Sequence, residues 1–480
     1  MKKHHIIVAT AVVTSMFFGI AHCVADDDDI ITIESSSVDY DGENLVLSDD
    51  VVIDHPFGVV MSQHATLFGD KGSNIKVVKL KDDVIISLDG GAELRCHNAS
   101  INQQTLSAVF SGSSPERRVV FTGSNDDGTP IVMKSMTMNV SFSKDEISSI
   151  YFVNNIFSQE NVFFTYGDSL TAIGDRAIYH SMKKSTDAGS PRGVIFLTPL
   201  KKGGLCRIFN DDIIINAMKI RLDTNGQEIL CSHVAGSVVD EDTAATTFKA
   251  NTVAWDVDDD ILSLHGDVFI EQKSLGVLTA DDDIYLHKGS SASWDTINGD
   301  GTTTWTYTNE LDGTISTITC HGTMLLDNVG KKLLFQSPED TVSNKTQVYY
   351  HNSLGEIYAD TIAVHYSDDV GSTTPTMMNV TGNVKIISSS SSRDGSSLQR
   401  FALADSAEYS IGAEGLLLKA DAGRRVLFLD KDNDLQVSAE AVMVHLVEDN
   451  DEETISTVGD VRFALNEEEY YDLKQNFNIE

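Results

Sequence analysis

A short sequence motif that recurs along the chain, which we call the first phrase, is the feature that most constrains its fold. It reads apolar, any residue, Gly or Asp, small polar, apolar, any residue, apolar. The copies are LSDDVVI (47–53), LKDDVII (80–86), LHGDVFI (264–270), CHGTMLL (320–326), VTGNVKI (380–386) and, with a substituted first position, TVGDVRF (457–463). The central pair predicts a tight bend or bulge, because Gly, Asp and Asn suit the backbone conformations of bends. The two apolar residues after it, separated by one position, point to the same face of a strand.

A second phrase opens on Ala and predicts the return strand of the same unit. It occurs as ANTVAWDV (250–257), ADDDIYLH (280–287), ADTIAVHY (359–366), ADSAEYSI (404–411) and AEAVMVHL (439–446). The spacings from Leu47 to Leu80 and from Ala404 to Ala439 set a unit of roughly 30 residues, which is typical of a stacked array. Each unit has an apolar face that it cannot bury alone. Stacked units would form two sheets whose inner faces make one continuous apolar strip.

Strand patterns dominate the rest of the chain, so the predicted fold class is all-β. Apolar and polar residues alternate, and the scarcity of Pro permits long hydrogen-bonded ladders. The best helical candidate is EEEYYDLKQNF (467–477), which could cap the array. The repeats are clear in 30–105 and 246–465 and diffuse from about 106 to 245. We therefore divide the chain into 26–245 and 246–480, either as two regions or as one continuous array.

The first 25 residues have the layout of a secretory signal peptide. Lys2 and Lys3 precede an apolar run from Ile6 to Ile20, and small residues at Ala21 and Ala25 predict cleavage before residue 26. An uncleaved membrane anchor and lipidation of Cys23 are the alternatives. The signal predicts export, most simply to the periplasm.

The charge balance argues against nucleic acid as a partner. The chain has 35 Lys and Arg against 72 Asp and Glu, a net charge of −37, whereas binding to phosphates depends on Lys and Arg. Its 41% apolar content is enough for a packed core.

Taken together, the two phrases resemble the units of the OstA/LptA-like family of lipopolysaccharide-transport proteins, and also the N-terminal periplasmic domain of LptD. LHGDVFI followed by LTADDDIYL, and VTGNVKI followed by ALADSAEYS, are similar to the family's repeat. The resemblance implies an elongated antiparallel β-jellyroll, or "β-taco" solenoid, that holds the acyl chains of lipopolysaccharide or another acylated lipid between the inner and outer membranes. It also implies docking to inner-membrane and outer-membrane transport proteins by edge-strand addition, with head-to-tail self-association as a further expectation. The chain departs from the family in being longer than the periplasmic shuttle and in lacking a long C-terminal barrel.

The residues after each bend are the predicted lining of this lipid-binding interior: Val51, Ile53, Val84, Ile86, Val268, Ile270, Val384, Ile386, Val461 and Phe463. The aromatic residues of the second phrase, Trp255, Tyr285, Tyr366 and Tyr409, are core residues by default, and we expect only some to line the interior. Cys206 and Cys231 lie about one repeat step apart and could form a disulfide; buried free thiols are the alternative.

Motifs for catalysis, cofactors or metals are not convincing in this sequence. DKDNDLQVSAE (430–440) resembles a calcium loop, but Leu435 replaces the required Gly and Glu440 is one residue early, which favours a polar turn. The prediction is a non-enzymatic protein without cofactor or metal. A structural or adhesive β-solenoid and a carbohydrate-active β-helix enzyme are the alternative functions.

Overall fold

The computed structural model describes residues 32–477 except 41–42, 56–57, 70–74, 89–90, 125–127, 145–150, 183–191, 224–227, 239–245, 258, 273–274, 290–293, 310–312, 339–345, 370–371, 392–396, 411–414, 432–433 and 448–451. The predicted signal peptide lies outside the described residues. The fold is all-β and antiparallel, as predicted. It divides into two compact units within β16, after Ser232, which is ahead of the boundary we placed after residue 245.

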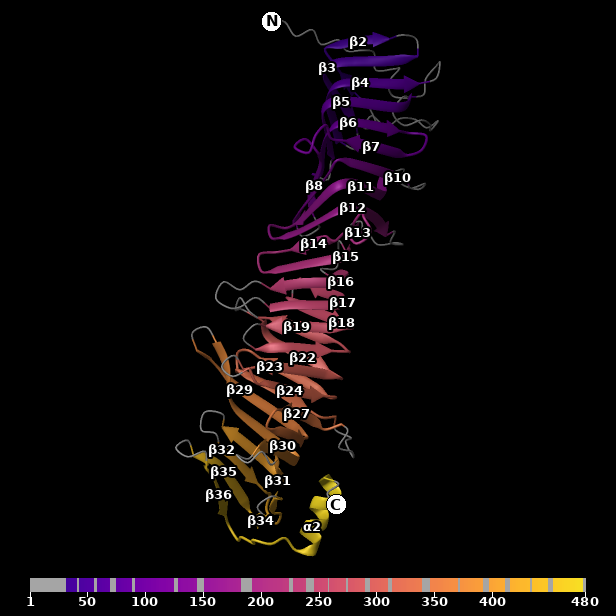
Figure 1. Cartoon of the computed structure of the whole chain (residues 1–480). Helices are drawn as coiled ribbons and strands as arrows, with labels where there is room; N and C mark the ends of the chain where they lie inside the picture. The colour runs from indigo at the N-terminus through magenta and orange to yellow at the C-terminus, as the bar shows by residue number, and fades with distance from the viewer. Residues whose placement is uncertain are drawn as a thin grey trace. The chain divides into compact units, whose positions relative to one another are not determined.

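Unit 1 consists of antiparallel strands, drawn from indigo to magenta in Figure 1. They are β1 (Thr32–Glu34), β2 (Ser37–Tyr40), β3 (Asn44–His55), β4 (Gly58–Gly69), β5 (Ile75–Leu88), β6 (Glu93–Asn102), β7 (Ser107–Ser111), β8 (Val119–Ser124), β9 (Pro130–Ser135), β10 (Thr137–Lys144), β11 (Tyr151–Tyr166), β12 (Leu170–Met182), β13 (Arg192–Thr198), β14 (Cys206–Phe209), β15 (Ile213–Asp223) and the first part of β16 (Glu228–Val238).

The predicted bend is a corner at which one long strand passes between two walls of sheet. In β3 the residues before the corner pair with β2, and those after it pair with β1. Asp49 and Asp50 at this corner have φ of 61° and 53°, in the left-handed region that Asp and Asn tolerate better than most residues. The ladder between β3 and β4 shifts register there, because Asp49 and Asp50 together oppose a single residue of β4 and form a bulge.

The same corner occurs in the region where the sequence repeats were diffuse. Glu160 and Asn161 in β11 have φ of 65° and 52°, and the register between β11 and β12 shifts at the same point. Sequence reasoning missed this copy because Ser158 replaces the first apolar residue of the phrase and Glu160 replaces its Asp or Gly. The two-walled architecture therefore includes the strands of residues 107–223.

Unit 2 contains the rest of β16 and the strands β17 (Thr246–Asp256), β18 (Ile261–His265), β19 (Val268–Gln272), β20 (Gly276–Ala280), β21 (Ile284–Lys288), β22 (Trp294–Asp300), β23 (Thr303–Thr308), β24 (Ile315–Cys320), β25 (Thr323–Asp327), β26 (Lys332–Gln336), β27 (Val348–Asn352), β28 (Gly355–Ala359), β29 (Thr361–Asp369), β30 (Ser372–Ser391), β31 (Ser397–Ser410), β32 (Gly415–Lys419), β33 (Val426–Asp430), β34 (Leu435–Ala439), β35 (Ala441–Val447) and β36 (Glu452–Val458). The one helix within the described ranges is α2 (Glu467–Phe477), at the residues predicted to be helical.

Two walls can be traced through unit 2 by the strand pairs. The first wall contains β19, β20, β23, β24, β27, β28, β33 and β34, and the second contains β18, β21, β22, β25, β26, β29, β32, β35 and β36. The long strands β17, β30 and β31 pair with members of both walls and turn from one to the other. At the corner between β18 and β19, Gly266 and Asp267 have φ of 70° and 48°.

The core lies between the two walls, where alternate side chains of both sheets point inward. Val253 and Trp255 of β17 are fully buried, whereas Lys249 on the same strand is exposed. Because both inner faces are apolar, the two sheets bury them against each other, as in other two-layer β folds.

Candidate binding interior and its C-terminal cap

Most of the predicted lining residues occupy the positions expected of them. Seven are buried, with exposed fractions between 1% and 8%, and Ile86 is half-buried: the buried residues are Val51, Ile53, Val84, Val268, Ile270, Val384 and Ile386. The intervening Phe269 is half-buried and pairs with the exposed Thr279 on the other face. The phrase therefore positions two side chains per copy in the interior.

Phe463 was wrongly predicted to line this interior, whereas Val461 is half-buried but lies outside the strands. β36 ends at Val458, before the corner sequence Gly459-Asp460, and Phe463 is 71% exposed. The following segment forms only an isolated bridge, between Arg462 and Ser438 of β34.

The interior is filled by the protein's own side chains. Residues from different strands of the second wall, such as Leu262, Leu286 and Phe335, are shielded completely from water. An acyl chain can therefore occupy this space only if inward side chains repack or the two walls separate.

Aromatic side chains distribute between the two faces as expected, with some inside and some outside. Trp255 and Tyr366 are buried at 0% and 5% exposure, whereas Tyr285 is 37% exposed and Tyr409 is half-buried. Sequence reasoning missed Trp294, which is 1% exposed at the start of β22, since it lies outside both phrases.

The predicted disulfide between Cys206 and Cys231 is not formed; both are buried free thiols. Cys206 lies on β14, which pairs with β12 on one edge and β15 on the other. Cys231 on β16 is therefore not on an adjacent strand. The two thiols are nevertheless close enough to interact, because the charge of Cys206 is a smaller cause, after burial, of the raised pKa of Cys231.

Buried thiols predict a loss of stability at alkaline pH. Burial raises the pKa of Cys231 to about 12 and, with the charge of Asp175 as a smaller cause, that of Cys206 to about 11, from the ordinary value of 9.0. Above pH 9 the unfolded chain gains thiolates that the folded chain does not, so the free energy of unfolding should fall between pH 9 and 12. Urea titrations across this range measure the loss. Cys206→Ala and Cys231→Ala should each make this alkaline loss of stability smaller. Iodoacetamide should label the two thiols at pH 8 only after the protein is unfolded.

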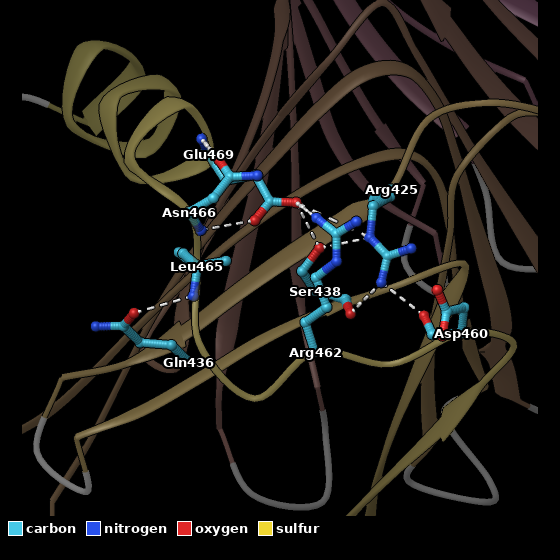
Figure 2. Close-up of polar contacts among 8 residues, drawn as sticks. All are labelled: Arg425, Gln436, Ser438, Asp460, Arg462, Leu465, Asn466 and Glu469. Atoms are coloured by element: carbon cyan, nitrogen blue, oxygen red, sulfur yellow. Dashed lines mark hydrogen bonds and ion pairs between the residues drawn. The ribbon is translucent and has the colours of Figure 1, made fainter.

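A return segment after β36 covers the free edge of β34 (Figure 2). The Ser438 N–H donates to the Arg462 carbonyl at 2.9 Å, and the Arg462 N–H donates to the Ser438 carbonyl at 2.8 Å. Arg425 fixes this bridge by donating to the Ser438 hydroxyl and carbonyl, both at 2.7 Å, and to the Asp460 carbonyl at 2.6 Å. Ser438 is fully buried, whereas Arg462 on the other side of the bridge is exposed.

Helix α2 begins with a capping box that ties it to the same bridge. The Asn466 side chain accepts from the Glu469 N–H at 2.8 Å, and the Glu469 carboxylate accepts from the Asn466 N–H at 2.9 Å. The other oxygen of that carboxylate accepts from the Ser438 hydroxyl at 2.8 Å. The helix start and the sheet edge thus share one hydrogen-bond network.

The helix also covers the outer face of the last strands. All five residues of β33 are buried, although a strand with one solvated face would alternate. Leu427 and Leu429 pack with Phe401 against Leu473 of α2, which is fully buried. We call residues 459–477 the C-terminal cap, because they close both the edge of β34 and the outer face of β33.

A buried ion pair stands at one end of β33, where the sequence suggested a calcium-like loop. The Arg400 Nε lies 3.1 Å from the Asp430 Oδ2, and the Asp430 side chain is 2% exposed. Asp430 therefore neutralises a cation of its own chain.

Comparison of the chain with protein-family models and with curated proteins finds no significant match. The resemblance to the OstA/LptA-like family therefore depends on the quoted phrases.

Proposed function

We propose that the protein is a non-enzymatic lipid-binding scaffold that holds acyl chains between its two β walls. The observation that carries the proposal is the series of inward Val, Ile and Leu residues repeated from strand to strand within each unit. Burial of one CH₂ group contributes about 0.8 kcal/mol, so a chain of about 12 carbons gains on the order of 10 kcal/mol. A repeated apolar lining offers such a chain many equivalent positions and no single deep trap.

The proposed setting is the periplasm, with lipopolysaccharide or another acylated lipid as cargo between the inner and outer membranes. The export signal and the resemblance of the repeats support this setting. Among the described residues, no helix is long and apolar enough to cross a membrane. Within the described strands, β36 pairs with β35 alone, so its other edge could accept a strand of a transport partner.

A fatty acid carrying a photoreactive diazirine tests lipid binding without altering the chain. After illumination, mass spectrometry should find cross-links at inward residues of β19 and β20, such as Val268, Ile270 and Leu278. The outward neighbours Phe269 and Thr279 are the internal control, because they lie on the same strands. Cross-links confined to outward residues, or none at all, would contradict the proposal.

A structural β array for surface interaction is the second candidate function. It is favoured by the shielding of the lining, since a packed interior needs no ligand to be stable. This candidate predicts that no lipid co-purifies with the native protein and that the fatty acid does not cross-link between the walls.

A further inference from the structure

Two tryptophan side chains in the interior of unit 2 have no acceptor for their indole N–H. Trp255 and Trp294 are 0% and 1% exposed, and within the described part of the chain neither Nε1 atom has a hydrogen-bond partner. Trp305, the third tryptophan of the chain, differs because its Nε1 donates to the Leu275 carbonyl at 2.8 Å. A buried indole normally finds a partner, because a buried donor left without one is unfavourable.

The two unpaired donors lie on the same wall, near the strand ends that are remote from the corners. Trp255 is the penultimate residue of β17, and Trp294 is the first residue of β22. Counting through β18 and β21, the two strands are three steps apart, or roughly 14 Å at ~4.8 Å per step. The rim of the second wall thus has two inward donors.

Between these donors the wall is aliphatic. Leu262, opposite Trp255, is followed by Leu286 and Ile297 in the adjacent strands, and all three are buried. A bound water molecule needs two to four polar partners, which these side chains do not supply. The acceptor that suits such a site is an oxygen attached to an apolar body.

We propose that Trp255 and Trp294 each donate a hydrogen bond to the carbonyl or carboxylate oxygen at the head of an acyl chain held in unit 2. The inference rests on the proposed lipid-binding function and adds the chemical group that the interior recognises. The hydrocarbon part of the ligand replaces aliphatic contacts in the interior. The oxygen satisfies the indole N–H at the rim, from which a head group can reach water.

The three indole N–H signals of the chain provide a direct test by NMR of the full-length protein labelled with ¹⁵N-tryptophan. Addition of lauric acid should shift the Trp255 and Trp294 signals downfield, whereas Trp305 keeps its bond to the Leu275 carbonyl and serves as the control. Single Trp→Phe variants assign the signals. Methyl laurate in a parallel titration distinguishes an ester carbonyl from a carboxylate, and shifts with either ligand support the shared chemistry.

Affinity measurements on the variants give a second readout. Trp255→Phe and Trp294→Phe should each weaken lauric acid binding about tenfold, the equivalent of one hydrogen bond of about 1.4 kcal/mol. The melting temperature without ligand should change little, because each variant also removes an unpaired buried donor. If the diazirine fatty acid cross-links between the walls but the two signals do not move and the affinity is unchanged, this inference is wrong and the proposed function stands. If no fatty acid binds, both fail.

Discussion

Removal of residues 459–480 should convert the protein into a species that self-associates at micromolar concentration. The deletion takes away both backbone hydrogen bonds between Ser438 and Arg462 and leaves the edge of β34 open. It also uncovers Leu427 and Leu429, which now pack against Leu473. An open strand edge beside an exposed apolar face is a template for pairing with another chain. Sedimentation velocity at several protein concentrations measures the change.

Point variants separate the contribution of the edge from that of the apolar face. Leu473→Ala should lower the stability of the cap by roughly 2–5 kcal/mol, as is usual for a fully buried Leu. Arg425→Ala should loosen the Ser438–Arg462 bridge, because Arg425 donates to both sides of it. Tyr471→Ala is the matched control, since Tyr471 lies on the same helix and is 65% exposed. A deletion variant that remains monomeric would show that the cap does not block association.

Asp430→Ala should destabilise unit 2 by about 3–5 kcal/mol. The substitution leaves the Arg400 guanidinium, whose side chain is 14% exposed, without the carboxylate that now lies 3.1 Å away. Loss of one member of a buried pair is costly, because the remaining charge stays desolvated. Urea unfolding followed by tryptophan fluorescence reports on this unit, since Trp255, Trp294 and Trp305 all belong to it.

The double variant Arg400→Met with Asp430→Leu tests the electrostatic cause. It removes both charges and replaces them with apolar side chains of similar size, so most of the lost stability should return. If the double variant is as unstable as Asp430→Ala, packing around β33 and not the ion pair determines the effect.

The repeats predicted the local structure well because their signals are local. Two branched residues after a Gly-Asp or Asp-Asp pair specify a strand and a corner, and Asp49, Asp82 and Asp267 all adopt the left-handed conformation. The position of a copy within the array decided whether its apolar residues are buried. The phrase at 457–463 has the same pattern as the others, yet Phe463 is exposed because the chain turns back there as the C-terminal cap.

Contacts between residues that are far apart in the chain could not be predicted from the sequence. The spacing of Cys206 and Cys231 suggested that they lie on adjacent strands. In the structure β14, which carries Cys206, pairs with β12 and β15, and Cys231 lies on β16. The unpaired indoles could not be foreseen either, because whether a buried donor meets an acceptor depends on the side chains opposite it.

The sequence by itself determined that this protein is all-β, that its strands turn at Gly and Asp corners, and that most of the Val and Ile residues after these corners face inward. These properties follow from backbone preference and from the two-residue period of a strand. Only the tertiary structure decided that the diffuse region shares the two-walled architecture, that the interior is filled, and that residues 459–477 close the edge of β34. The reason is that edges, shielding and hydrogen-bond partners arise from strands that meet only after the chain has folded.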